Sequence, residues 1–143
     1  MIDQEVIISR LDRIKKNLKV LEKITDIPFD EFVSNSLYHL AAERAIQTSI
    51  QAMIDICSYL VAESQAAMPA QYGELPQILS KEGVFPKDLA DRLTSMIGMR
   101  NVLVHEYLQI DLERVYTAIR DNLGDFDEFA RHIVAYLEKQ ELQ

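Results

Sequence analysis

Four polar side chains of different chemistry stand close together near residue 100 of this chain: Arg100, Asn101, His105 and Tyr107. Arginine presents a planar fork of donors that suits phosphate oxygens, and it keeps its charge at every relevant pH. Histidine exchanges a proton near neutrality. Asparagine can donate to a phosphate or orient the imidazole, and tyrosine adds a hydroxyl. This set of side chains is suited to cleaving a phosphodiester bond without a metal.

RNA is the substrate that such a set fits best, because RNA supplies its own nucleophile. A base removes the proton of the ribose 2′-OH, a cation stabilises the crowded phosphorane, and an acid protonates the leaving 5′ oxygen. No serine or cysteine nucleophile and no cage of metal-binding carboxylates is then required. We therefore expect neither a metal nor another cofactor.

The geometry of a helix limits how these side chains can meet. Arg100 and His105 are five residues apart, which is ~140° of rotation and ~7.5 Å of rise, and Arg100 and Tyr107 are ~10 Å apart along the axis. One straight helix cannot gather them around a small group. Either the helix ends near His105, so that Tyr107 enters the following loop, or a second chain completes the site.

A purely structural interpretation of the same residues stays open at this point. Position 100 continues an apolar stripe through Leu89, Leu93 and Ile97, so an arginine there falls on a face that ought to be buried. It could be a buried arginine paired with a carboxylate such as Glu43 or Asp111, with His105 capping a helix end.

A metal site receives little support elsewhere in the chain. His39 and Glu43 are four residues apart, a spacing that can hold a metal, but two ligands without a third are a weak signal. An intrahelical or interhelical hydrogen bond is the better prediction for them. The one cysteine, Cys57, cannot form an intramolecular disulfide and is most simply a small core residue.

Helical periodicity accounts for nearly the whole chain, and no segment alternates as a half-buried strand would. We expect residues 1–143 to form one domain, an all-α, up-and-down bundle of four long helices plus one short helix. Asp30 is the expected N-cap of the second long helix and Asp111 that of the last, in which Gly124 could cause a bend. The expected helices span residues 3–24, 30–63, 76–82, 86–105 and 112–139, with a loop at 64–74.

Charge is distributed unevenly along the chain. The net charge is −8, which disfavours a protein that coats nucleic acid nonspecifically. Residues 10–23 nevertheless carry a local balance of +4, and residues 24–143 carry −10. This basic segment is either a solvated helix face or a patch that contacts phosphate or an acidic partner. Its cationic residues are Arg10, Arg13, Lys15, Lys16, Lys19 and Lys23.

The location expected from the sequence is the cytoplasm. No stretch approaches the roughly 20 consecutive apolar residues of a membrane span. The segment Met1-Ile2-Asp3-Gln4-Glu5 is acidic where a signal peptide would be basic. We expect no contact with a membrane.

The segment from Arg100 to Tyr107 resembles the signature of HEPN domains, in which Arg is followed by four residues, His, one residue and Tyr. The similarity is to the HepT-like branch of toxin proteins and extends over essentially the whole chain. It includes a basic amphipathic first helix, the segment Ala-Glu-Arg-Ala-Ile-Gln at 42–47, and a short helix that ends before Gly83 and Pro86.

This resemblance implies a ribonuclease that acts as the toxin of a toxin–antitoxin pair. It implies a homodimer in which two Arg100–His105 pairs face one another across a cleft, with Asn101 in support. It also implies a partner nucleotidyltransferase antitoxin that adenylylates Tyr107, which would place a bulky anion in the phosphate-binding cleft. Two alternatives remain: a noncatalytic module that binds nucleotide or docks a nucleotidyltransferase, and a helical dimer without a site.

Overall fold

A computed structural model describes residues 2–105 and 111–142, and at 101, 102, 104 and 105 it describes the backbone alone. Within these ranges the chain is helical and has no strand. The four long helices are α1 (Gln4–Thr25), α3 (Ser36–Glu63), α5 (Lys87–His105) and α6 (Leu112–Glu141), and the shorter elements are α2 (Phe29–Ser34), the 3-10 turn η1 (Tyr72–Glu74) and α4 (Leu75–Lys81).

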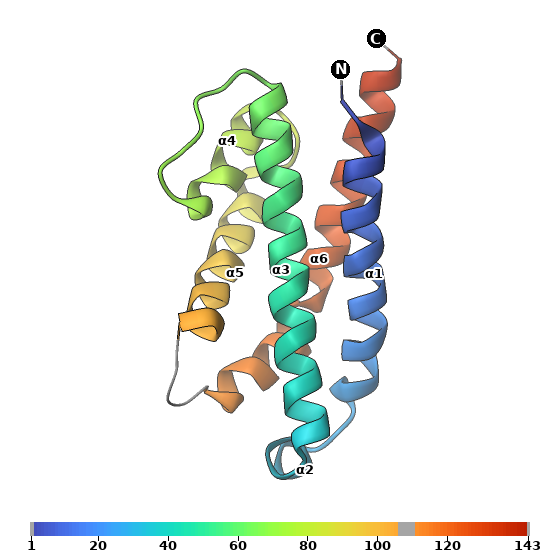
Figure 1. Ribbon diagram of the computed structural model, residues 1–143, viewed down its shortest axis with the longest axis vertical. Helices are drawn as coiled ribbons and strands as arrows, with labels where there is room; N and C mark the ends of the chain where they lie inside the picture. The colour runs from blue at the N-terminus through green and yellow to red at the C-terminus, as the bar shows by residue number, and fades with distance from the viewer. Residues whose placement is uncertain (1, 106–110, 143) are drawn as a thin grey trace.

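The long helices alternate in direction, so the prediction of an all-α, up-and-down bundle is confirmed (Figure 1). The α3 helix occupies the centre of the view, with α1 along one side and α5 along the other, while α6 runs behind. The chain ends lie together at one end of the bundle, where the Gln4 side-chain amide donates to Glu141 at 2.8 Å.

The predicted start of the second long helix is wrong, because the segment is broken into α2 and α3. Asp30 lies in the first turn of α2, and Asn35 is the N-cap of α3, with an extended backbone at φ −108° and ψ 107°. Its side chain accepts a hydrogen bond from the backbone N–H of Leu37 at 2.9 Å. Asparagine competes for backbone donors in this way and favours caps over helix interiors.

The short helix and the last helix agree with prediction. After α4, Gly83 has a φ of +83°, a conformation that glycine adopts at no steric cost. Its N–H donates to Ser80 and that of Val84 to Leu79, which closes the helix with a Schellman motif. Asp111 caps α6 by accepting from the Arg114 N–H, as expected, and the helix continues through Gly124.

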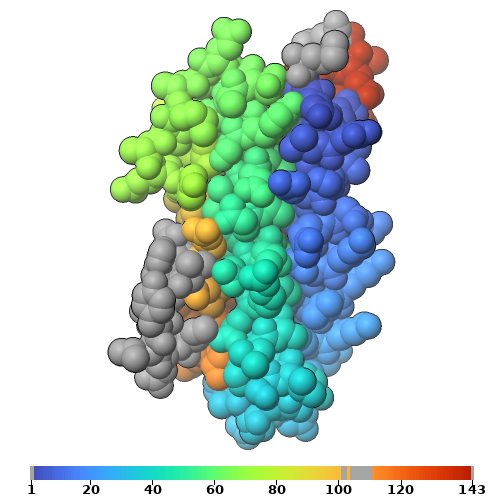
Figure 2. Space-filling model, viewed as in Figure 1, coloured from blue at the N-terminus to red at the C-terminus, as the bar shows by residue number. Residues whose placement is uncertain are grey.

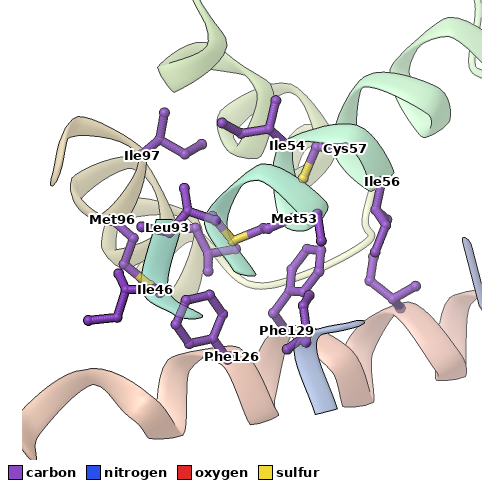
Figure 3. Close-up of a cluster of buried hydrophobic side chains, with 14 of the residues drawn as sticks. Ile46, Met53, Ile54, Ile56, Cys57, Leu93, Met96, Ile97, Phe126 and Phe129 are labelled. Carbon is purple, nitrogen blue, oxygen red and sulfur yellow. The ribbon is translucent and has the colours of Figure 1, made fainter. Parts of the chain in front are cut away.

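The hydrophobic core is centred on α3, which packs against all of the other α-helices. In Figure 3, Met53 of α3 lies between Leu93 of α5 and Phe129 of α6, and Cys57 follows one turn further along α3. All four side chains are fully buried. Cys57 is thus the core residue that was predicted, and burial raises the pKa of its thiol well above the ordinary range. This packing fixes α5 against the rest of the bundle.

By length and composition, α3 is the one described helix that could cross a membrane. Sixty-one per cent of its most apolar window is buried inside the bundle. Its hydrophobicity is therefore accounted for by the core that it forms with the other helices.

Candidate functional site

The residues of interest lie at the end of α5. Leu89, Leu93 and Ile97 anchor the helix with fully or almost fully buried side chains, as the apolar stripe predicts. Arg100 follows on the same side and is half-buried. The described part of α5 ends at His105. The side chains of Asn101 and His105, and Tyr107 as a whole, lie outside what the structure describes.

Arg100 is held by a neutral partner. Its Nη2 donates a hydrogen bond to Oε1 of Gln51 on α3 at 2.6 Å. Its Nε is buried and has no hydrogen-bond partner among the described residues. Because an amide carries no net charge, this contact fixes the guanidinium without neutralising it. The Nε–H of Arg100 therefore remains available to donate to another group.

The carboxylates considered as structural partners of Arg100 are engaged elsewhere. Oε2 of Glu43 lies 3.5 Å from Nδ1 of His39. The side chain of Asp111 caps α6. Across residues 2–100 and 111–142 no carboxylate forms an ion pair with Arg100. The interpretation of this residue as one half of a buried salt bridge therefore finds no support in that part of the chain.

The Gln51 side chain is itself part of a longer series of contacts. Its Nε2 donates to Oδ1 of Asp55 at 2.9 Å, one turn further along α3. The other oxygen of Asp55 accepts from Nε of Arg10 on α1 at 3.3 Å. These contacts link Arg100 of α5, through α3, to Arg10 of the basic helix α1. Sequence reasoning missed Gln51, and only the four-residue spacing of Gln51 and Asp55 could have drawn attention to it.

A second arginine fixes α5 to α6. Arg92 hydrogen-bonds Asp125, which is buried, as well as Glu128 at 2.8 Å and Asp88 at 3.3 Å. The hydrogen bonds to Glu128 and Asp125 raise the pKa of Arg92 further above its already high value. Unlike Arg100, this arginine is surrounded by carboxylates and serves as a structural anchor.

The basic residues of α1 all have exposed side chains, so the predicted solvated basic face is present. Within the described part of the chain, two of them take part in ion pairs: Arg10 with Asp55 and Lys16 with Asp12. The hydrogen bond from Lys16 lowers the pKa of Asp12. Figure 2 shows α1 running along one side of the visible face, with α3 between it and α5. Contact with RNA or an acidic partner remains a prediction for this face.

The two residues considered as half of a metal site lie close together, but the hydrogen bond predicted for them is not found among the described residues. His39 and Glu43 lie on successive turns of α3, and both side chains are largely buried. At 3.5 Å from Oε2 of Glu43, Nδ1 of His39 is buried and has no hydrogen-bond partner among the described residues. The described residues contain no group of three or more His, Cys, Asp or Glu side chains that could hold a metal ion.

Comparison with known families supplies an independent line of argument. A family model described as "Ribonuclease HepT-like" matches residues 14–133. The tRNA nuclease HepT of Aphanizomenon flos-aquae is 32% identical over 136 residues, covering 95% of this chain and 92% of that protein. The mRNA nuclease HepT of Shewanella oneidensis is 24% identical and covers 87% of this chain and 93% of its own length.

Solved structures share the same fold. The tri-AMPylated HEPN toxin of Shewanella oneidensis, in complex with its MNT antitoxin, matches with a TM-score of 0.83 and 25% identity, over 94% of this chain and 99% of that one. The cytosolic protein YutE of Bacillus subtilis matches with a TM-score of 0.85 over 97% of this chain and 93% of its own; at 22% identity it shows the fold alone.

Proposed function

The chain belongs to the HepT-like ribonuclease family, and we propose that it is a metal-independent RNA endonuclease, the toxin of a toxin–antitoxin pair. Relatives that match it over most of their length are named as nucleases of tRNA and of mRNA. The observation that carries the proposal is the environment of Arg100. Its guanidinium is held in place by a hydrogen bond to the neutral Gln51. Because this contact leaves the positive charge in place, the guanidinium can still bind a phosphate.

In the proposed reaction the RNA provides the nucleophile. A His105 side chain takes the proton of a ribose 2′-OH, and the oxygen attacks the adjacent phosphorus. Arg100 stabilises the additional negative charge of the phosphorane, and Asn101 supports the site by donating to the phosphate or orienting the imidazole. Protonation of the 5′ oxygen releases the downstream strand and leaves a 2′,3′-cyclic phosphate.

The proposed site is composite and lies in the cleft of a homodimer. His105 lies five positions after Arg100, so on one helix their side chains point in directions ~140° apart. A second copy facing the first would bring both pairs to one phosphate. In such a two-fold site one His105 can act as the base and the other as the acid.

Tyr107 is the proposed point of control. The Shewanella toxin was solved in an AMPylated form with its MNT antitoxin. By analogy, a partner nucleotidyltransferase would transfer AMP from ATP to the phenolic oxygen of Tyr107, releasing pyrophosphate. The new phosphodiester would place a negative charge and an adenosine beside the cationic cleft, blocking RNA both sterically and electrostatically. All of these steps take place in the cytoplasm under this proposal.

The proposal is tested by the products of cleavage. Purified protein is incubated with total cellular RNA and excess chelator, and the new 3′ ends are analysed. We expect fragments that end in a 2′,3′-cyclic phosphate and activity that is insensitive to the chelator. Cleavage that stops when the chelator is added would overturn metal independence.

The alternative is a noncatalytic HEPN module that docks a nucleotidyltransferase or presents nucleotide to it. The same fold would serve this role, since the partner surface does not require a competent phosphate site. Absence of RNA cleavage at every protein concentration, together with a stable complex with a nucleotidyltransferase, would favour it.

A further inference from the structure

Three hydrogen bonds join Arg100 to the opposite side of the bundle. Arg100 donates to Gln51 at 2.6 Å, Gln51 donates to Asp55 at 2.9 Å, and Arg10 donates to Asp55 at 3.3 Å. The four residues come from three helices, α5, α3 and α1, and α3 stands between the other two in Figure 1. From end to end the residues are cationic, neutral, anionic and cationic.

The chemistry of the neighbours fixes which way the Gln51 amide points. A guanidinium can only donate and an ionised carboxylate can only accept. The amide oxygen must therefore face Arg100 and the amide nitrogen must face Asp55. Neither neighbour would tolerate the flipped amide, so Gln51 has one orientation.

Few other side chains could replace Gln51 in this place. A carboxylate would neutralise the charge of Arg100 and would repel Asp55. An apolar side chain would leave Nη2 of Arg100 without an acceptor while its Nε is already buried without a partner among the described residues. A glutamine both orients the guanidinium and preserves its charge, which is what binding of a phosphate requires.

We propose that Gln51 is the positioning residue of Arg100, held in place by Asp55 and Arg10. It touches no reacting atom and acts by aiming the guanidinium at the scissile phosphate. Asp55 fixes the amide, and Arg10 offsets the charge of Asp55. This inference rests on the proposed ribonuclease function and assigns Arg10 a role in the site besides any contact with RNA.

The first test compares two glutamine substitutions of the same kind. Gln51→Met keeps the length of the side chain and removes both hydrogen bonds. The control is Gln77→Met, because Gln77 also donates to an aspartate, Asp91, at 2.9 Å and also braces α5, from α4. We expect Gln51→Met to lower kcat by roughly 10- to 100-fold with little change in KM, and Gln77→Met to change kcat by less than about twofold. Equal losses in both variants would overturn the proposal.

The second test asks whether the loss acts through Arg100. In an Arg100→Lys background the guanidinium is gone, so adding Gln51→Met should cost less than about twofold more. Substituting Asp55→Ala alone should lower kcat in the same direction as Gln51→Met, by a smaller factor. If Gln51→Met costs its full factor in the Arg100→Lys background, Gln51 does not act through Arg100 and the proposal fails.

A third measurement does not depend on activity and separates this inference from the proposed function. Heteronuclear NMR of the arginine side chains reports how freely the Arg100 guanidinium rotates and how fast its protons exchange. We expect a slowly exchanging Nη2 proton in wild type and in Gln77→Met, and averaged signals in Gln51→Met. Averaged signals in wild type would overturn the positioning role. Wild-type protein that gives the expected spectrum but cuts no RNA would overturn the proposed function alone.

Discussion

At the scale of single residues, the two arginines of α5 show how the partner decides the role. Arg92 contacts three carboxylates and holds two helices together, while Arg100, about two turns later, contacts an amide and keeps its charge. Sequence spacing correctly marked Arg100 as out of place on an apolar stripe. The spacing could not show which partner Arg100 has, because Gln51 lies 49 residues away on another helix.

Tyr107 carries a prediction about covalent control. Incubating the protein with the proposed nucleotidyltransferase partner and ATP should add the mass of AMP, and Tyr107→Phe should abolish that addition because the phenolic oxygen is gone. Mass spectrometry of the intact protein and of its peptides measures both.

Tyr116 supplies the matched control, since its hydroxyl already donates to the carbonyl of Ile27 at 2.7 Å and its ring packs on Phe32. Tyr116→Phe should still be modified. If Tyr107→Phe accepted AMP as readily as wild type, the assignment of the modification site would be wrong.

Cys57 gives a residue-scale test of the core. Its side chain is fully buried and its thiol pKa is strongly raised, so at pH 8 it should be almost entirely protonated and out of reach of reagents. We expect a thiol reagent to label the folded protein only as fast as the protein opens, and to label it within seconds to minutes in denaturant. Rapid stoichiometric labelling of folded protein would contradict the described packing of α3.

At the scale of elements, periodicity predicted the long helices well and their ends less well. Apolar spacing located α1, α5 and α6 to within two residues of the observed ends, and proline and glycine marked the limits of α4. The break between α2 and α3 was not predicted, because no proline or glycine lies there. Only Asn35, a residue that caps helices by its own side chain, carried that information.

Asn35 therefore offers a test of how α3 begins. Asn35→Ala removes the acceptor for the Leu37 N–H and should lower the free energy of unfolding by about 1 kcal/mol, the usual worth of an N-cap. Urea unfolding followed by circular dichroism measures the change.

Asn35→Ser is the companion variant, because serine can cap in the same way and should retain most of the stability. Unchanged stability in Asn35→Ala would mean that the cap contributes nothing to the start of α3.

At the scale of the whole molecule, an acidic protein is proposed to act on an acidic polymer. The net charge of −8 opposes RNA at long range, whereas the exposed basic face of α1 and Arg100, which has no carboxylate partner among the described residues, would attract it locally. The helical bundle followed from the sequence because every long helix has its own apolar stripe. The link from Arg10 of α1 to Arg100 of α5 runs through Asp55 and Gln51 of α3. These side-chain contacts join distant parts of the chain, so no local sequence pattern predicts them.

If the site is composite, as proposed, activity depends on the assembly of two copies. If each site needs two copies, cleavage per subunit should fall when the protein is diluted below the dissociation constant of the dimer. Measuring specific activity alongside mass by light scattering or mass photometry over a dilution series checks this. Constant activity per subunit across the transition from dimer to monomer would show that one chain is sufficient.

Arg100 and His105 are proposed to cleave RNA without a metal. The most direct measurement is the cleavage rate in excess chelator for Arg100→Ala and His105→Ala beside wild type. Arg131→Ala and His132→Ala on α6 serve as controls of matching residue type. We predict losses on the order of 10²- to 10⁴-fold in the first two variants and near wild-type rates in the controls. Wild-type rates in both Arg100→Ala and His105→Ala would contradict the account.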